Sequence, residues 1–319
     1  YELSAVLLSA PSRIMISEML TSEQRLALLR RTLKWAEEKI EFYRAAFARA
    51  GLSHACVQSF ADMVKFPFWD DVVKEGADAP FFMLTLPLSS LLRMSVLCDD
   101  DGTYGIHCYT QGDIARQVQT AADMLVSCGV NRASTVLLTG DFADSRTLDL
   151  QYALDSIGAA VLPCTGADTA EQLLRAAVPD TIIAWEHDLP ALAEVMGDSY
   201  MNRLITVGNY IMPQVFACEL AERTGVRHTH IYTLAQMGAL IGAGCAANEG
   251  IHLEDRLFFA EVVDETGRSS CESDACGQLV LSTIAAEAQP ILRYRTGLSV
   301  RLIREQCSCG DARLRIIEE

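Results

Sequence analysis

Four side chains of the kind that bind zinc stand in two short segments of the chain. Cys245 and His252 are separated by six residues, and Cys307 and Cys309 are separated by one. Thiolates with one imidazole make the closed, tetrahedral set of a structural zinc site, and four protein ligands leave no position for a reactive water. The spacing therefore favours structural zinc over metal catalysis. It leaves a second interpretation open, with two buried cysteines, a surface histidine and an accidental Cys-x-Cys pair.

Two further pairs of residues compete with this set for a metal. Cys271 and Cys276 lie in the sequence SSCESDACG, which is typical of a variable hairpin loop. His228 and His230 alternate along a predicted strand, so both side chains lie on one face of it. Such a pair can bind a metal, but we expect it to face solvent where the strand enters the sheet.

Residues 98–105, CDDDGTYG, have the position and outline of a phosphate-binding loop between two structured segments. Three consecutive aspartates stand where a phosphate would lie. One aspartate about 5 Å from a phosphate charge costs roughly 3 kcal/mol at an effective dielectric constant near 20. We therefore expect this segment not to bind ATP. A calcium loop of the EF-hand type is excluded, because Leu97 and Cys108 would occupy its first and last ligand positions.

Residues for nucleophilic catalysis are not indicated by spacing, either as a Ser/His/Asp or as a Cys/His arrangement. Three aspartates lack a nucleophile or base at a fixed spacing: Asp141, Asp144 and Asp149. We expect them to cap helices or to lie at the surface. The sequence therefore offers no catalytic residue.

The composition limits the partners of the chain. Its 319 residues are 50% hydrophobic, enough to bury a sizeable core in two or three lobes. A net charge of -16 repels nucleic acid and anionic lipid, so we expect neither as a partner. The sequence contains no long apolar run for a spanning helix, and its start is a poor signal peptide. Eleven cysteines, an odd number and mostly single, favour a reduced, cytoplasmic setting over a disulfide framework.

Apolar periodicity predicts helices first and then an alternation of helices and strands. Residues 22–50 have helical spacing, and residues 59–76 predict a short helix, a proline break and another helix start. From residue 113 to residue 234, helical segments alternate with apolar strands, which predicts a parallel sheet covered by helices. After about residue 250 short strands follow, with a hairpin turn at residues 264–267.

The predicted fold class is therefore α/β, with parallel sheets covered by helices and a smaller C-terminal β-rich lobe. We place an α/β domain with two α/β subdomains at residues 1–245, and the β-rich lobe with the zinc site at residues 246–319. No internal repeat and no linker longer than an ordinary loop is found in the sequence.

Several segments, in order along nearly the whole chain, resemble the phenylacetate–CoA ligase branch of the AMP-forming, adenylate-forming (acyl-CoA synthetase) superfamily. The first are EFYRAAFARAGL and SFADMVKFPFWDDV, and residues 97–110 fall where this family has its Ser/Thr/Gly-rich phosphate loop. Later ones are HIYTLAQM, GQLVLSTIAAEAQPILRYRTGLSVRLI and CSCG. The resemblance implies the family's large α/β domain with an attached β-rich lobe. It also implies a metal at the Cys/His and Cys-x-Cys positions, where members of this branch carry one.

The resemblance further implies activation of a carboxylic acid with ATP and transfer of the acyl group to coenzyme A. The positions of the family's nucleotide site in this sequence are Gly102, Tyr232, Gln236 and Arg295. Gln236 replaces a magnesium-ligating glutamate, and Leu298 replaces the ribose-binding aspartate, which removes a buried acceptor worth a few kcal/mol. Residues 208–211, GNYI, replace the family's Gly-Ala-Glu-Pro. The sequence stops at Glu319, about where the family's C-terminal catalytic domain and its lysine would begin.

These departures predict a degenerate, non-catalytic adenylation domain that lacks the family's C-terminal domain and keeps structural zinc. Tyr232, where the family stacks adenine, fits a core position equally well. We expect an aryl or acyl small molecule or a protein as partner, a homodimer by family analogy alone, and no binding of ATP, magnesium or CoA. Two alternatives stay open. One is an AMP-forming aryl- or acyl-CoA ligase with a remodelled ATP site, its C-terminal domain missing or supplied in trans. The other is a decaying gene product without a ligand.

Overall fold

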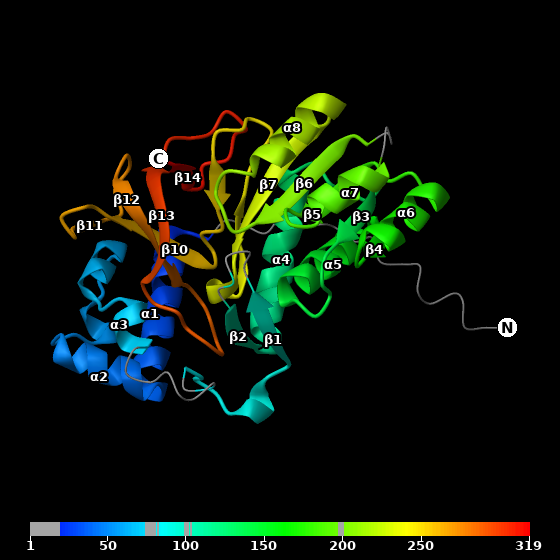
Figure 1. The fold of residues 1–319 in the computed structure, drawn as a ribbon. Helices are drawn as coiled ribbons and strands as arrows, with labels where there is room; N and C mark the ends of the chain where they lie inside the picture. Colours follow the sequence, from blue (N-terminus) through cyan, green and yellow to red (C-terminus); the bar gives the residue numbers. More distant parts are fainter. Residues whose placement is uncertain (1–19, 74–80, 82, 99–101, 103, 197–200) are drawn as a thin grey trace.

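The computed structural model describes residues 20–73, 81, 83–98, 102, 104–196 and 201–319, and shows an α/β body beside a β-rich body (Figure 1). The described part of the chain starts with helices that pack against the β-rich body. The helices are α1 (Ser22–Lys39), α2 (Glu41–Arg49) and α3 (Trp69–Val73), and the 3-10 turns that accompany them are η1 (His54–Cys56), η2 (Phe60–Lys65) and η3 (Leu88–Ser90). A capping box between Thr21 and Gln24 starts α1, which satisfies backbone groups that a helix end leaves open.

The α/β body is a doubly wound parallel sheet. Its strands are β3 (Thr135–Thr139), β4 (Ala160–Cys164), β5 (Thr181–Trp185), β6 (Arg203–Gly208) and β7 (Arg227–Leu234), in the order β4-β3-β5-β6-β7. The helices are α4 (Gln111–Ser127), α5 (Ser145–Ile157), α6 (Ala167–Ala176), α7 (Leu189–Met196) and α8 (Val215–Thr224). The winding direction reverses between β3 and β5, and open α/β sheets bind ligands at such a point.

Side chains of the parallel strands alternate between two buried faces. Val136 and Leu138 of β3 belong to the core formed with α4 and α5. Leu137, between them, belongs to the core formed with α6, α7 and α8. Because helices cover both faces, these strands are apolar at nearly every position, which explains their continuous apolar runs in the sequence.

The β-rich body continues the same sheet in antiparallel fashion. Its strands are β8 (Ala239–Ala243), β9 (Ile251–Leu253), β10 (Phe258–Val263), β11 (Ser269–Ser270), β12 (Cys276–Thr283), β13 (Tyr294–Ile303) and β14 (Arg315–Glu318). Within the described residues, twelve strands form one sheet, and its order from β7 onward is β8-β9-β14-β13-β12-β10-β11. The joint of this sheet at β9 is narrow. β9 is three residues long, and only two residue pairs tie it to β8 and two to β14.

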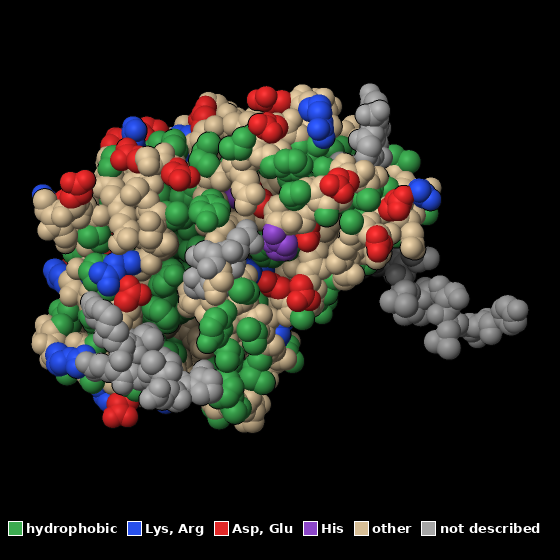
Figure 2. Space-filling model, in the orientation of Figure 1, with side chains coloured by type: hydrophobic (Ala, Val, Ile, Leu, Met, Phe, Trp, Pro, Cys, Tyr) green, Lys and Arg blue, Asp and Glu red, His purple; other side chains and the backbone are tan. Residues whose placement is uncertain are grey.

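A separate hairpin lies below the carboxyl ends of the parallel strands. It consists of β1 (Arg93–Cys98) and β2 (Tyr104–Tyr109), and it contacts α5 and the 3-10 turn η4 (Ala235–Met237). Met94 and Val96 on its outer side are 58% and 65% exposed. Figure 2 shows apolar side chains gathered over this end of the molecule.

These observations confirm the predicted α/β class and most of the predicted elements. Residues 22–50 form two helices, and the hairpin turn at 264–267 is closed by a 2.9 Å bond from the Gly267 amide to the Asp264 carbonyl. The boundary at residue 245 falls between β8 and β9 and stays a prediction, since one sheet runs through both parts. Among the described residues, no helix has the length and apolar character needed to cross a membrane.

Candidate functional site

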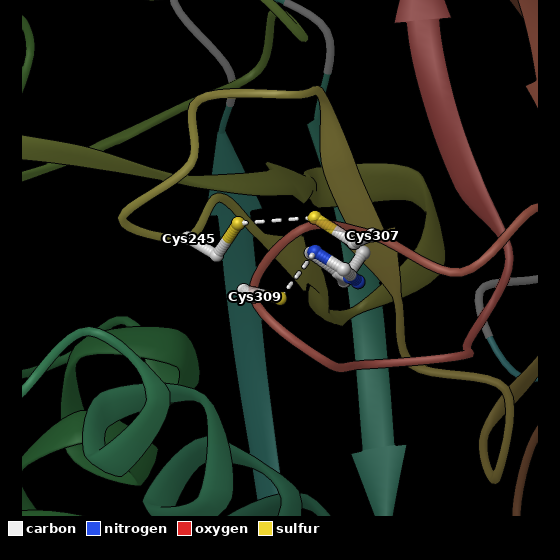
Figure 3. A group of neighbouring side chains, drawn as sticks. Cys245, Cys307 and Cys309 are labelled. Atoms are coloured by element: carbon white, nitrogen blue, oxygen red, sulfur yellow. Dashed lines mark hydrogen bonds between the residues drawn. The ribbon is translucent and has the colours of Figure 1, made fainter.

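The four candidate zinc ligands come together at the joint of the sheet. Cys245 follows β8, His252 lies in β9, and Cys307 and Cys309 lie in the loop between β13 and β14. Figure 3 shows the three cysteines turned toward one another from these two segments. One ligand atom of each residue lies within 4.8 Å of those of the other three. Convergence of segments far apart in the sequence argues against an accidental Cys-x-Cys pair.

The distances between the ligand atoms fit a tetrahedral zinc ion. The Sγ atoms of Cys245 and Cys307 are 3.7 Å apart, and Sγ of Cys309 is 3.6 Å from Nε2 of His252. With Zn–S bonds of about 2.3 Å, Zn–N bonds of about 2.0–2.1 Å and tetrahedral angles, S···S is about 3.8 Å and S···N about 3.6 Å. The sulfur atoms of a disulfide are only about 2.05 Å apart, and these cysteines are free. The residues present therefore fit zinc.

Local backbone structure presents the Cys307–Cys309 pair as a tight turn. The Gly310 amide donates to the Cys307 carbonyl over 2.9 Å, and Gly310 has a φ of +92°, a conformation that favours glycine. Loss of hydration raises the pKa of the Cys307 thiol to about 12, with hydrogen bonds to Cys309, Cys245 and Glu249 among the further causes. The metal-free thiol is thus protonated at neutral pH, and a metal has to displace this proton when it binds.

Carboxylates and arginines surround the four ligands. The Nε2 atom of His252 faces Cys309, while its buried Nδ1 atom lies 3.5 Å from Oδ2 of Asp311 without forming a hydrogen bond to it. Arg313 donates to the same carboxylate oxygen over 2.6 Å. A carboxylate that accepts a hydrogen bond from the outer nitrogen fixes the orientation and tautomer of a metal-binding histidine, and Asp311 is the nearby carboxylate that could take this role. The sequence analysis missed Asp311, and its position two residues after Cys309 was the available signal.

The competing cysteines lie outside this cluster. Cys271 is half-buried and packs against the core of the N-terminal helices. Cys276 is exposed at the start of β12, and its Sγ atom lies 3.0 Å from Oε1 of Glu319. Neither cysteine belongs to the metal-ligating group found in the described part of the chain.

Gln236, at the position expected for the magnesium ligand, is engaged within the chain. Its Nε2 atom donates to the backbone carbonyl of Tyr104 over 2.7 Å, which ties η4 to the β1–β2 hairpin. An ionised carboxylate has no proton to donate, so this bond requires the amide. Gly102 adopts a φ of +81° with open space around it, as a turn glycine does. The three aspartates at residues 99–101 and residue 103 lie outside the described residues.

Three other positions of the expected nucleotide site pack within the protein. Tyr232 is fully buried in the apolar core of the β-rich body, and Leu298 packs against the same core. Arg295 donates to Oδ2 of Asp70 over 2.8 Å, and its guanidinium lies 4.7 Å from the ring centroid of Phe68. In this conformation Tyr232 is a core residue, the second of its two expected roles.

Side chains pack closely at the carboxyl ends of β3 and β5, where the sheet reverses its winding. Trp185, the last residue of β5, packs so closely on Gly140 that a Cβ atom there would lie 2.7 Å from the indole. The indole Nε1 atom donates to Oγ1 of Thr147 over 3.0 Å. Arg146, only 1% exposed, stacks over the indole at 4.7 Å and pairs with Asp144 at 2.7 Å. The sequence analysis missed this stacked pair of Trp185 and Arg146, because no local pattern marks an arginine that will be buried.

The histidine pair of β7 differs from the expected solvent-facing arrangement. His228 and His230 do lie on one face, since Oγ1 of Thr206 is 2.9 Å from Nε2 of His228 and 2.8 Å from Nδ1 of His230. His230 is nevertheless only 4% exposed, and its Nε2 atom donates to the Tyr210 carbonyl over 2.8 Å. Burial lowers the pKa of His230 to about 4. The expectation was wrong for His230 because β7 lies inside the sheet with both faces covered.

Asp149 is also wrongly expected at the surface. It is 2% exposed and accepts from Nη1 of Arg93 over 2.6 Å, and burial raises its pKa to about 6. Asp144 caps α5 as expected, and Asp141 accepts a backbone hydrogen bond in the preceding turn. Asp149 is buried because α5 lies between the parallel sheet and the β1–β2 hairpin.

Comparison with known proteins finds relatives of low identity over most of the chain. No protein-family model matches it. The phenylacetate-coenzyme A ligase of Thermus thermophilus is 25% identical over 312 residues, which cover 90% of this chain and 67% of the relative. That of Escherichia coli is 26% identical over 289 residues, or 86% of this chain and 65% of the relative. The chain thus spans about two thirds of the length of the curated relatives that it matches.

Solved structures agree with this grouping at the level of the fold. An open conformation of 2-hydroxyisobutyryl-CoA ligase in complex with 2-HIB-AMP and CoA matches with a TM-score of 0.80 at 18% identity, over 92% of this chain and 73% of that one. The same enzyme in its postadenylation state matches with a TM-score of 0.79 at 17% identity, over 93% of this chain and 67% of that one. The chain is therefore similar in sequence to phenylacetate-coenzyme A ligases, and it shares the fold of 2-hydroxyisobutyryl-CoA ligase.

Proposed function

We propose that this chain is an adenylation domain without ATP-dependent ligase activity, which serves as a zinc-braced binding module. Its partner would be an aryl or acyl small molecule or another protein. The observation that carries the proposal is the hydrogen bond from Gln236 to the Tyr104 carbonyl. The position at which the resemblance puts a magnesium ligand is instead engaged in holding the β1–β2 hairpin.

The chemistry of two replaced side chains supports this proposal. Magnesium is bound mainly through carboxylates and phosphates, and the neutral amide of Gln236 is a poorer ligand. A carboxylate in its place would face the Tyr104 carbonyl, and two hydrogen-bond acceptors form no hydrogen bond with each other. Leu298 has no atom that accepts a hydrogen bond from a ribose hydroxyl. Both changes weaken the binding of ATP more than that of a ligand without phosphates.

The stacked pair of Trp185 and Arg146 supports the proposal independently. It occupies the carboxyl end of the sheet at the winding reversal, the place where open α/β proteins bind their ligands. A nucleotide at this place would have to displace Arg146, which is buried in its pair with Asp144. Breaking a buried pair by moving one partner is costly, because the other charge stays behind without compensation.

Zinc in this proposal is structural. Cys245, His252, Cys307 and Cys309 would hold it and leave no open position for water, so it would supply rigidity and not a reactive hydroxide. It would tie the loop after β8 to the loop before β14, on either side of the short strand β9. All eleven cysteines are free thiols, which suits a reducing compartment, and we place the protein in the cytoplasm on that ground.

Calorimetric titration with ATP and magnesium tests the loss of the nucleotide site. The phenylacetate-coenzyme A ligase of Escherichia coli serves as the positive control. Each lost charged hydrogen bond or metal contact costs about 1.5–3 kcal/mol, and 1.4 kcal/mol is tenfold in affinity. With two such losses we expect binding at least about 100-fold weaker than in the control. Affinity within tenfold of the control would refute the proposal.

Pyrophosphate exchange distinguishes the proposal from the competing ligase function. Exchange between ATP and pyrophosphate is measured with a panel of aryl acids, for the chain alone and with the C-terminal part of a relative added in trans. We expect no exchange above the acid-free blank in either case. Acid-dependent exchange would establish an adenylating enzyme with a remodelled ATP site. Thermal shift with the same acids then tests whether any acid still binds.

A further inference from the structure

A pocket elsewhere in the molecule shares no lining residue with the metal cluster or with the expected nucleotide site. Its volume is about 340 Å³, within the 300–1,000 Å³ that small-molecule sites occupy. Helix α1, helix α4 and the segments around residues 256 and 285 form its walls. The residues that line it are Leu20, Leu28, Arg31, Ala115, Arg116, Gln119, Thr120, Arg256, Leu257 and Ala285.

The lining combines apolar side chains with positively charged ones. No acidic residue lines the pocket, whereas three arginines do, on a chain with a net charge of -16. Two of these arginines are already paired. Arg116 pairs with Asp113 and Glu287 at 2.7 and 2.9 Å, and Arg256 pairs with Asp123 at 2.6 Å. These two therefore contribute mainly their carbon stems to the wall.

Arg31 is the third arginine that lines the pocket, and it differs from the other two in its contacts. Its guanidinium lies 5.1 Å from the centroid of the Trp35 ring, and within the described part of the chain no ion pair is found for it. Its side chain is exposed at the pocket edge. Against the effect of burial, hydrogen bonds from Thr110 and Arg116 lower the pKa of Glu287, and Arg31 lies near enough to add a smaller contribution.

The pocket wall also contains a strained residue. Ala285 has a φ of +63°, a left-handed conformation that residues other than glycine rarely adopt, and it is 2% exposed. The Ala285 amide donates to Oγ1 of Thr32 on α1 over 3.0 Å, which holds this conformation against the helix. Strained backbone that the surroundings hold in place is frequent at binding sites. The pocket thus combines the volume of a small-molecule site, a positively charged lining and a strained residue in its wall.

We infer that this pocket binds a small molecule with an apolar body and a carboxylate head. The body lies between α1 and α4, against Leu28 and Leu257, and the carboxylate pairs with the guanidinium of Arg31. Planar guanidinium recognises a carboxylate through two parallel hydrogen bonds, which an alcohol or an ammonium group cannot reproduce. The pocket shares no residue with the expected nucleotide positions or with the zinc positions. A test of either of those sites therefore does not test binding in this pocket.

Decanoate is a suitable probe, titrated calorimetrically into the whole chain below its micelle-forming concentration. Decanol and decyltrimethylammonium have the same body with a neutral or a cationic head. We expect decanoate to bind best, and Arg31→Gln to weaken it about 2- to 5-fold, as for an ion pair at an exposed site. Decanol binding should not change in this variant. Ala115→Trp fills the pocket and should weaken all three ligands at least tenfold.

Matched variants control for charge and for bulk. Lys34→Gln removes a positive charge on α1 outside the pocket, and Ala48→Trp adds an indole at an exposed alanine of α2. Both should bind decanoate as the unaltered chain does, with circular dichroism verifying the fold of each variant. Unchanged binding in Ala115→Trp, or equal affinity for decanoate and decanol with no effect of Arg31→Gln, would overturn the inference. Sedimentation showing a dimer that Ala115→Trp dissociates would also overturn it, because a second copy would then cover the pocket.

Discussion

Removal of a metal from the Cys245–His252–Cys307–Cys309 cluster should lower the unfolding midpoint by several degrees. The ligands lie in β9 and in the loops beside it, and only two residue pairs join β9 to β8 and two to β14, so a metal would reinforce a thinly paired part of the sheet. Free zinc at 100 to 1,000 times its dissociation constant stabilises by about 2.7–4.1 kcal/mol. An unfolding entropy of about 2.1 cal/mol/K per residue, over 319 residues, turns this into a shift of about 4–6 °C.

The assay is differential scanning calorimetry with and without a strong zinc chelator, together with metal analysis of the purified chain. We expect close to one zinc per chain, and Cys307→Ser should abolish both the metal and the response to the chelator. Cys56→Ser, which alters an exposed cysteine outside the cluster, is the matched control and should keep both. Far less than one zinc per chain, or the same chelator response in both variants, would refute the reasoning.

Two further predictions concern the buried interior. His230, with an unfolded pKa near 6.5 and a folded pKa of about 4, is neutral in the fold, so its stabilisation is complete above pH 6.5. Stability should fall as the pH drops from 6.5 toward 4, by up to about 1.4 kcal/mol per pH unit, and His230→Gln should flatten this slope in urea titrations. The exposed His187→Gln should not, and equal slopes would contradict the argument. Gly140→Ala, with a φ of +141° and a Cβ 2.7 Å from Trp185, should cost at least about 2 kcal/mol. Gly244→Ala, whose Cβ would make only ordinary contacts, should cost less than half as much, and similar losses would show that the space around Gly140 is not tightly filled.

The layered part of the fold could be predicted because its pattern is local. Helices α4 and α5 and strands β3 to β7 each show their period within one segment, and covered parallel strands require continuous apolar runs. The joint at β9 could not be predicted in this way. A three-residue strand has no period of its own, and its pairing with β14 depends on a segment far along the chain.

The local sequence pattern also did not predict which polar side chains are buried. Alternation placed His228 and His230 on one face correctly, but only the packed helices determine that this face is closed. The same holds for Asp149, whose pKa rises because α5 is covered by the β1–β2 hairpin. Arg146 carried no signal at all, since arginines are almost always exposed.

The sequence by itself determined which functional groups the chain can offer: three thiols and an imidazole for a metal, an amide at residue 236 and a leucine at residue 298. Tertiary structure alone decided their distances and partners. It set the 3.7 and 3.6 Å separations at the metal cluster, and it engaged Gln236 with Tyr104. The physical reason is that the type of a side chain is encoded at one position. Its distances, hydration and pKa depend on neighbours that come from elsewhere in the chain.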